Sequence, residues 1–239
     1  NYIEFIFDYN NVEENPLMSE TGVERISVLS ANYNVQVKTV CADYFMEYPL
    51  HSMLDQVSKI SMDMLNKLIT QCNKIGITDI IIPCVDQSSL KDKTVQNTFI
   101  NKMKYIANKL DNNNINLSLE TDLNPTDFLK VINRINSPNI TVNYDLGNSS
   151  SLGYDISEEF EYYGSLITDI HVKDRLLDGG SVFLGDGNAD FSLFFHEMNK
   201  INYNGPIIMQ AFRDDDGIEV FNSQLTWLKN KYKRFINSN

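Results

Sequence analysis

Short apolar runs alternate with longer amphipathic runs along the whole chain. The short runs are rich in Ile, Val, Phe and Tyr and are mostly apolar on both faces, which is typical of strands in a parallel sheet that is covered on both sides. They lie at residues 3–7, 35–42, 79–85, 116–120, 140–146, 167–172 and 206–210. The pattern therefore predicts seven parallel strands.

The longer runs repeat their apolar residues at helical spacing. Apolar residues recur every three or four positions at 99–110, and similar stripes lie at 128–135 and 221–235. Each stripe indicates a helix that packs one face against the sheet. Residues 125–127, Pro-Thr-Asp, are expected to open the second of these helices, and Ser52 is expected to cap another.

Strand–helix alternation over the whole chain predicts an α/β fold, and its period favours a closed barrel. Glu120, Asp145 and His171 are 25 and 26 residues apart, close to the period of a TIM (β/α)8 barrel of about 250 residues. A doubly wound sheet usually has a Gly-rich first turn, which this sequence lacks. We therefore expect a single TIM-barrel domain over residues 1–239. Because an open barrel would leave two strand edges unpaired, we expect the first β/α unit to precede residue 1.

Composition narrows the classes of partner. The chain has 20 basic and 32 acidic residues, a net charge of −12. Such a chain repels phosphate backbones and anionic lipids, so neither nucleic acid nor a membrane is an expected partner. Three cysteines, Cys41, Cys72 and Cys84, show no zinc-site spacing. Cys41 and Cys84 lie in apolar, strand-like runs and are expected to be buried free thiols, which indicates a reducing cytoplasm.

Polar residues suited to metal binding end four successive predicted strands. They are Glu120, Asp145, His171 and Gln210. Barrel strand ends meet at one mouth, so these side chains are expected to converge there. Two carboxylates and one imidazole suit Mn²⁺, Co²⁺, Mg²⁺, Zn²⁺ or Fe²⁺ without choosing between them. One acid at a strand end more often caps a helix, as expected for Asp190, and it is the recurrence in register that favours a metal site.

Four motifs resemble those of a known family. They are Glu-Thr-Asp at 120–122, Tyr-Asp-Leu-Gly-Asn at 144–148, Ile-His-Val-Lys-Asp at 170–174 and Gly-Asp-Gly-Asn-Ala-Asp-Phe at 185–191. In this order and spacing they are similar to the motifs of xylose isomerase-like barrels. The Asp-x-Gly-Asn form is most similar to the L-ribulose/L-xylulose-5-phosphate 3-epimerase (hexulose-6-phosphate isomerase) branch. The resemblance covers nearly the whole chain, from the family's second strand onward.

The resemblance implies a metal-dependent isomerase or epimerase that acts on a small sugar or sugar phosphate through an enediolate. By position, Glu120 would be the catalytic base and a metal ligand. Asp145 and His171 would be further ligands of a divalent metal such as Mn²⁺, Co²⁺, Mg²⁺ or Zn²⁺. Asn148 and Lys173 would line the substrate site. The family also implies a homo-oligomer.

Gln210 departs from the family pattern, which has a second Glu at this position. A Gln carbonyl can still bind a metal, but it is neutral and cannot accept a proton as a carboxylate does. We therefore expect weak metal affinity and weak or absent two-base epimerisation. A one-base isomerisation or dehydration at Glu120 stays open. Three acids, Asp214 to Asp216, lie just beyond Gln210 as other candidate proton carriers.

Residues 44–50 are a second departure. The epimerase branch tends to carry a basic, His-containing stretch there, whereas this chain reads Tyr-Phe-Met-Glu-Tyr-Pro-Leu with His51 as the nearest basic candidate. A phosphate group normally needs Arg, Lys or helix N–H groups, so a phosphorylated substrate is in doubt. The alternative function is a catalytically lapsed member that binds a sugar or a protein partner. A DNA-repair nuclease would need a basic face and more than the three histidines of this chain.

Overall fold

The structure, a computed structural model, describes residues 2–110, 114–212 and 217–238. The chain divides into two compact units, Asn1–Asn143 and Tyr144–Asn239. The main strands are hydrogen-bonded in the order β1-β2-β3-β4-β5-β6-β9, which is also their order in the sequence. The seven strands predicted from the apolar runs are therefore confirmed.

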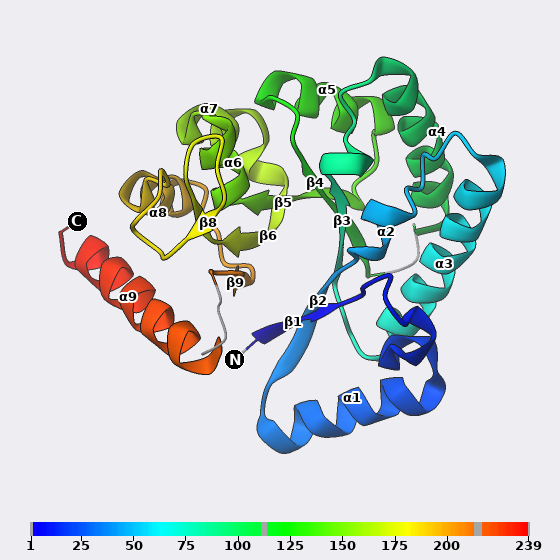
Figure 1. The fold of residues 1–239 in the computed structure, drawn as a ribbon, viewed down its shortest axis with the longest axis horizontal. Helices are drawn as coiled ribbons and strands as arrows, with labels where there is room; N and C mark the ends of the chain where they lie inside the picture. Colours follow the sequence, from blue (N-terminus) through cyan, green and yellow to red (C-terminus); the bar gives the residue numbers. More distant parts are fainter. Residues whose placement is uncertain (1, 111–113, 213–216, 239) are drawn as a thin grey trace. The chain divides into compact units, whose positions relative to one another are not determined.

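The first unit is built from β-strands joined by helices (Figure 1). The pairs β1–β2, β2–β3, β3–β4 and β4–β5 are all parallel. Its elements are β1 Tyr2–Ile6, η1 Val12–Glu14, η2 Pro16–Met18, α1 Glu20–Tyr33, β2 Gln36–Cys41, α2 Tyr44–Glu47, α3 Asp55–Lys74, β3 Asp79–Cys84, η3 Asp86–Ser88, α4 Lys93–Leu110, β4 Asn116–Thr121, α5 Pro125–Ile135 and β5 Ile140–Asp145, whose last two residues begin the second unit.

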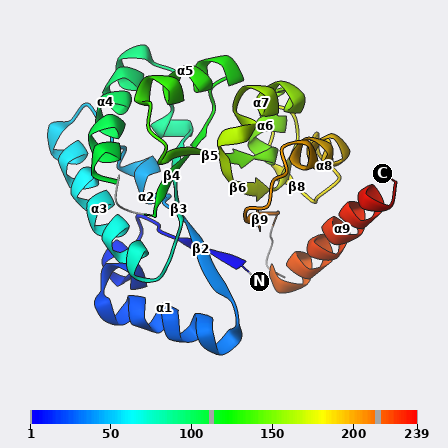
Figure 2. The same ribbon diagram turned by 180° about the vertical axis from the view of Figure 1, so that it is seen from behind.

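The second unit continues the strand–helix alternation and adds a small hairpin (Figure 2). Strands β6 and β9 pair in parallel, and β7 and β8 form an antiparallel ribbon that the apolar pattern does not predict. Its elements after β5 are α6 Leu146–Leu152, α7 Ile156–Tyr163, η4 Gly164–Leu166, β6 Ile167–Val172, β7 Asp174–Arg175, β8 Ser181–Val182, α8 Phe191–Lys200, β9 Ile207–Met209 and α9 Gly217–Ser238.

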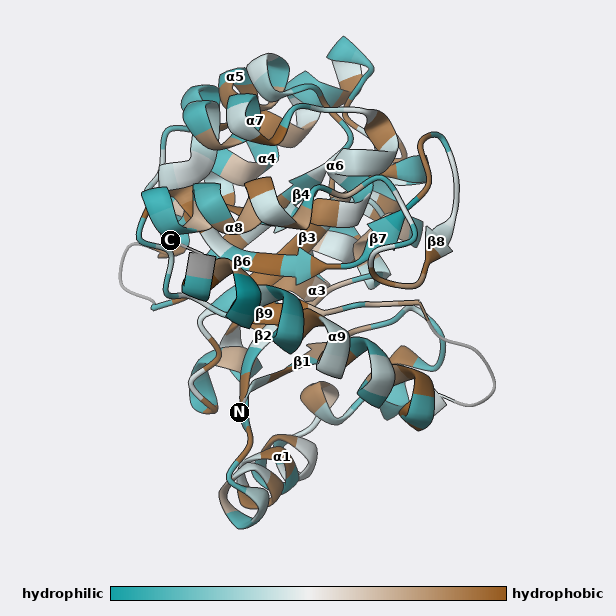
Figure 3. Cartoon of the chain, turned by 90° about the vertical axis from the view of Figure 1, so that its left-hand side faces the viewer, coloured by the Kyte–Doolittle hydropathy of each residue, from teal (hydrophilic) through white to brown (hydrophobic). Residues whose placement is uncertain are grey.

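The core explains why these sequences form these elements. All six residues of β3 are buried, as expected for a parallel strand covered on both faces. The stripe predicted on α4 is confirmed, because Phe99, Met103, Ile106 and Leu110 are all buried. Figure 3 shows hydrophobic colour over part of β6, interrupted by a hydrophilic segment, and hydrophilic colour on many turns of the helices.

Two of the three helix starts that the sequence predicts are found in the structure. Pro125 is at the first turn of α5, and Asp190 caps α8 through the N–H groups of Ser192 and Leu193, so both expectations are confirmed. The expectation that Ser52 caps a helix is wrong, because α3 has Leu54 at its N-cap. The Ser52 hydroxyl instead accepts the N–H of Leu54 at 3.3 Å in the preceding turn.

Two other expectations can be compared with the structure. Cys41 and Cys84 are buried free thiols, as the sequence predicts, and Cys72 is also free and buried. Asp214, Asp215 and Asp216 lie outside the described residues. No helix in the described part of the chain combines the length and apolarity needed to cross a membrane.

His51 is buried and does not supply a cation. Its side chain is 5% exposed, and its ring meets the ring of Phe99 edge-on at 5.5 Å between centroids. Burial lowers the pKa of His51 from its usual 6.5 to about 4, against a smaller opposing effect from a backbone hydrogen bond with Ser88. The His51 ring is therefore neutral near pH 7. Residues 44–51, which follow β2, thus have no cationic side chain at this pH.

We expect the His51→Leu variant to lose less stability in acid than the wild type does. Because the pKa of His51 is lower in the folded than in the unfolded state, the unfolded state binds more protons between pH 6.5 and 4. The wild type should lose up to about 3 kcal/mol of unfolding free energy across this window through His51 alone. Urea unfolding at pH 7 and pH 4 measures this loss. His196→Leu, at an exposed position of α8, is the control, and an equal acid loss in all three proteins would contradict the assignment.

Candidate metal and substrate site

Asp145 ends β5 and caps the helix that follows. Its Oδ1 accepts the backbone N–H of Asn148 at 2.9 Å, which fixes the first turn of α6. Its Oδ2 lies 2.6 Å from the Lys173 ammonium and 3.9 Å from His171 Nδ1. One carboxylate oxygen therefore holds the turn, and the other faces two site residues of the same unit.

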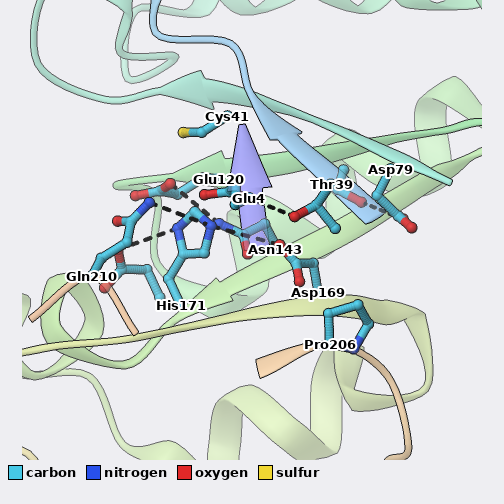
Figure 4. A network of polar contacts seen from close by, with 12 residues as sticks. Glu4, Thr39, Cys41, Asp79, Glu120, Asn143, Asp169, His171, Pro206 and Gln210 are labelled. Atoms are coloured by element: carbon cyan, nitrogen blue, oxygen red, sulfur yellow. Dashed lines mark hydrogen bonds and ion pairs between the residues drawn. The ribbon is translucent and has the colours of Figure 1, made fainter. Parts of the chain in front are cut away.

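His171 and Gln210 lie together because β6 and β9 are paired. His171 is opposite Ile208 in this register, and the Gln210 N–H donates to the Val172 carbonyl at 3.0 Å. The Gln210 Nε2 lies 3.5 Å from His171 Nε2, which also lies 3.6 Å from the Asp169 carboxylate (Figure 4). The imidazole is fully buried. The structure thus brings three of the four predicted metal ligands, Asp145, His171 and Gln210, into one cluster within the second unit.

Lys173 reaches Asp145 because Gly147 leaves room for it. A Cβ on Gly147 would lie 2.3 Å from Lys173 Cγ and 3.1 Å from the Lys173 carbonyl carbon and oxygen. Real Cβ atoms essentially never approach a heavy atom within 3.0 Å. The glycine of the Asp-x-Gly-Asn motif therefore lets the lysine stem lie across the first turn of α6.

We expect Gly147→Ala to destabilise the protein by about 1–3 kcal/mol, the usual cost of overpacking a tight site. Alanine normally stabilises a helical position relative to glycine by up to about 1 kcal/mol, so a loss here would report the crowding at Lys173. Chemical denaturation measures the change. Gly180→Ala is the matched control, since a Cβ there meets nothing within 4 Å. An unchanged or raised stability in Gly147→Ala would contradict the packing argument.

The loop after β8 is fixed by a buried carboxylate. Asp174 accepts the backbone N–H groups of Gly185, Gly187 and Ala189 at 2.8 to 3.1 Å, and it is fully buried. A Cβ on Gly187 would lie 2.2 Å from the Asp174 Oδ1, so only glycine fits there. Asp174 therefore organises the Gly-Asp-Gly segment at 185–187 as a structural residue and is not placed among the candidate ligands.

A buried carboxylate also lies behind α6. Glu159 of α7 accepts hydrogen bonds from the hydroxyls of Tyr144 at 3.0 Å, Tyr163 at 2.7 Å and Ser149. Burial raises the pKa of Glu159, against the opposing effect of these three hydrogen bonds. Tyr144 and Ser149 flank the segment from Asp145 to Asn148. Their hydrogen bonds to Glu159 therefore connect both ends of this segment to α7. The sequence pattern does not predict this network, because its members are spread over the three elements β5, α6 and α7.

Glu120 lies at the end of β4 in the first unit. It is 7% exposed, and its Oε2 accepts a hydrogen bond from Asn143 Nδ2 at 3.3 Å. Asn143 and Asp145 are two positions apart on β5, and alternate residues of a strand point to the same face. Within the first unit, the Glu120 carboxylate is therefore held by a residue of β5.

Polar side chains on neighbouring strands of the first unit also hydrogen-bond to one another. Thr39 donates to Glu4 Oε2 at 3.0 Å (Figure 4). Ser118 donates to Asp79 Oδ1 at 3.0 Å. Ser118 also lies 2.7 Å from the Thr141 hydroxyl. The sequence pattern missed this layer, because single polar residues inside apolar strands gave no signal of their own.

The family model described as "Xylose isomerase-like TIM barrel" matches residues 1–231. The chain belongs to this xylose isomerase-like family. The predicted TIM-type barrel fold is thereby confirmed, and the match runs through both compact units.

Relatives of this xylose isomerase-like chain carry sugar-epimerase names. It is 25% identical over 230 residues to a putative L-ribulose-5-phosphate 3-epimerase, SgbU, of Haemophilus influenzae, with 89% of this chain and 79% of the relative covered. It is 23% identical over 211 residues to the Escherichia coli protein of the same name, with 81% and 73% covered. These relatives confirm the resemblance that the four motifs indicate.

Solved structures share the fold. An L-ribulose 3-epimerase matches with a TM-score of 0.74 at 17% identity, covering 99% of this chain and 83% of that one. The IolI protein, solved with a bound zinc atom, matches with a TM-score of 0.77 at 12% identity, covering 97% and 88%. At these identities the structural matches support the barrel fold and no more.

Proposed function

We propose that this chain is a metal-dependent isomerase or epimerase that acts on a small sugar or sugar phosphate through an enediolate. The observation that carries the proposal is the cluster of the buried Asp145 and His171 with the half-buried Gln210, beside Lys173. The sugar-epimerase names of its relatives support the substrate class. Because the family match crosses the boundary between the compact units, we also propose that residues 1–239 form one barrel domain.

The donor atoms fit a divalent metal. Asp145 Oδ2 and His171 Nδ1 are 3.9 Å apart, too far for a hydrogen bond. Metal bonds to such ligands are about 2.0–2.2 Å long, so one ion can reach both atoms. A carboxylate and an imidazole suit Zn²⁺, Mn²⁺ or Co²⁺ more than Ca²⁺. Gln210 would offer a neutral carbonyl oxygen as a further ligand.

Glu120 is proposed as the third charged ligand and as the base. Glu120, Asp145 and His171 are residues of the types that can together hold a metal ion. The contact of Glu120 with Asn143 supports its place, since Asn143 shares a strand face with Asp145. The match of the Glu-Thr-Asp segment to the family motif points to the same role.

The chemistry follows from these roles. A bound metal would polarise the ketose carbonyl, which makes the neighbouring C–H more acidic. Glu120 would remove that proton and return it. Asn148 and Lys173 would bind oxygens of the sugar. Because Gln210 cannot carry a proton, the proton returns from the side of Glu120, which favours aldose–ketose isomerisation over inversion at one carbon.

A second candidate function is sugar binding without turnover. Gln210 in place of a carboxylate favours it. So does the segment of residues 44–51, where no side chain is a cation near pH 7 because His51 is neutral. Metal binding together with absent turnover would distinguish this candidate from the first.

Metal titration followed by turnover assays tests the proposal. Chelator-treated protein is titrated calorimetrically with Mn²⁺, Co²⁺ and Zn²⁺, and then assayed with L-ribulose 5-phosphate and unphosphorylated ketoses. We expect Asp145→Asn to weaken metal binding at least about 100-fold, more than the loss of an outer-shell partner usually does. Asp127→Asn, at a half-buried position of α5 that is not part of this cluster, is the control. Equal metal affinity in the two variants would contradict the site.

A further inference from the structure

The Asn148 side chain is held by a guanidinium that the sequence motifs do not single out. Arg175 Nη1 donates to Asn148 Oδ1 at 2.7 Å. Arg175 Nε and Nη2 both donate to the Gly179 carbonyl, at 3.0 and 2.8 Å. A guanidinium fixed through three N–H groups has little freedom to turn. Arg175 directly follows Asp174 in the sequence, and the Asp174 carboxylate accepts hydrogen bonds from three backbone N–H groups.

The hairpin that carries Arg175 is itself tied to α6. The Ser151 hydroxyl donates to the Gly179 carbonyl at 3.3 Å, and the Asp178 N–H donates to the Ser151 carbonyl at 2.9 Å. The same carbonyl of Gly179 therefore meets both Arg175 and α6. This arrangement fixes Arg175 relative to the helix whose first turn holds Asn148.

The contact decides which way the Asn148 carboxamide is turned. A guanidinium has only donors, so the atom that faces it must be the carbonyl oxygen of Asn148. The NH₂ group then points away from Arg175. The Asn148 backbone N–H is already bound by Asp145 Oδ1. The turn next to Asp145 thus carries a side-chain donor whose direction is set by Arg175.

We propose that Arg175 is a positioning residue that presents the Asn148 NH₂ group as a hydrogen-bond donor to the substrate. The group that it meets is an acceptor oxygen of the sugar, a carbonyl or hydroxyl oxygen. This inference rests on the proposed function, because it takes Asn148 as a substrate-binding residue. Arg175 acts through Asn148 and has no role of its own in proton transfer.

A double-mutant cycle tests the proposal. The metal-loaded wild type, Arg175→Met, Asn148→Ala and the double variant are assayed with L-ribulose 5-phosphate and with L-ribulose. Arg175→Met is expected to raise KM about tenfold, as the loss of one well-oriented hydrogen bond does, and to change kcat less than about threefold. In the Asn148→Ala background the same change should alter KM less than about twofold. Arg175→Lys keeps one donor and should restore part of the loss.

Other outcomes of the cycle would overturn the positioning role of Arg175. Equal KM effects in both backgrounds, or equal losses in kcat and KM, would show that Arg175 acts on the fold and would overturn the proposal. An effect confined to the phosphorylated ketose would overturn the assignment of a sugar oxygen.

A second measurement needs no substrate, so it separates this inference from the proposed function. The side-chain NH₂ signals of Asn148 are assigned by NMR from their loss in Asn148→Ala. They should shift in Arg175→Met and stay in place in Gly180→Ala. Absent turnover in the wild type would count against the proposed function alone, whereas unshifted Asn148 signals in Arg175→Met would overturn the positioning role.

Discussion

The Glu120→Gln variant is expected to lose metal-dependent turnover by about 10²- to 10⁴-fold, the usual contribution of a positioned general base. Glutamine has the same size, and its carbonyl oxygen can still accept the hydrogen bond from Asn143 Nδ2. The fold should therefore be kept while the proton acceptor is removed. Steady-state kcat/KM with the metal-loaded protein measures the loss, and chemical denaturation shows whether the fold is intact.

Asp122→Asn is the matched control for this variant. Asp122 lies two residues from Glu120 and pairs with the Ser89 hydroxyl at 2.8 Å and with Lys91 at 3.0 Å, contacts that hold a surface turn. It should change turnover less than about threefold. If Glu120→Gln kept wild-type turnover, Glu120 would not be the base. If both variants lost turnover equally, the effect would come from the loop and not from the carboxylate.

The Gln210→Glu variant is expected to bind a divalent metal about 10- to 100-fold more tightly than the wild type. A carboxylate adds a full negative charge where Gln210 offers only an amide, and charges near a partly buried cation are weakly screened. The backbone at this position is fixed by the 3.0 Å hydrogen bond to the Val172 carbonyl, and the side chain already lies 3.5 Å from His171. The new carboxylate should therefore start from a position close to the metal ligands.

Calorimetric titration with Mn²⁺ or Co²⁺ measures the gain. Gln56→Glu, at an exposed position of α3, adds the same charge outside the cluster and serves as the control. The restored carboxylate should also supply a second proton carrier, so inversion at the carbon next to the carbonyl should rise relative to isomerisation. An unchanged metal affinity in Gln210→Glu would contradict the assignment of residue 210 as a ligand.

The sequence predicts the strands and the strand-end residues because both depend on local patterns. Seven short apolar runs separated by longer amphipathic runs are typical of parallel strands covered by helices. Parallel strands in sequence order place their carboxyl ends on one edge, so the clustering of Asp145, His171 and Gln210 follows from strand assignment alone. The family match then confirms the barrel type.

The remaining features depend on contacts between distant positions. Asp174 binds N–H groups 11 to 15 residues further on, and Arg175 binds Asn148 27 residues before it. No periodicity in the sequence reports such pairs. The error at Ser52 has a similar origin: a hydroxyl residue near a helix start is a good cap only if the chain turns at that residue, and here the helix begins after Leu54.

Solvent proton exchange tests the central claim most directly. Wild-type protein is incubated in D₂O with L-ribulose 5-phosphate and other ketoses, with and without Co²⁺ or Mn²⁺, and the sugars are followed by NMR after the metal is removed. The account predicts loss of a C–H signal next to the carbonyl on at least one ketose, and only with metal present. Retention of every such signal, with metal shown to be bound, would contradict a working base and would favour a binding protein.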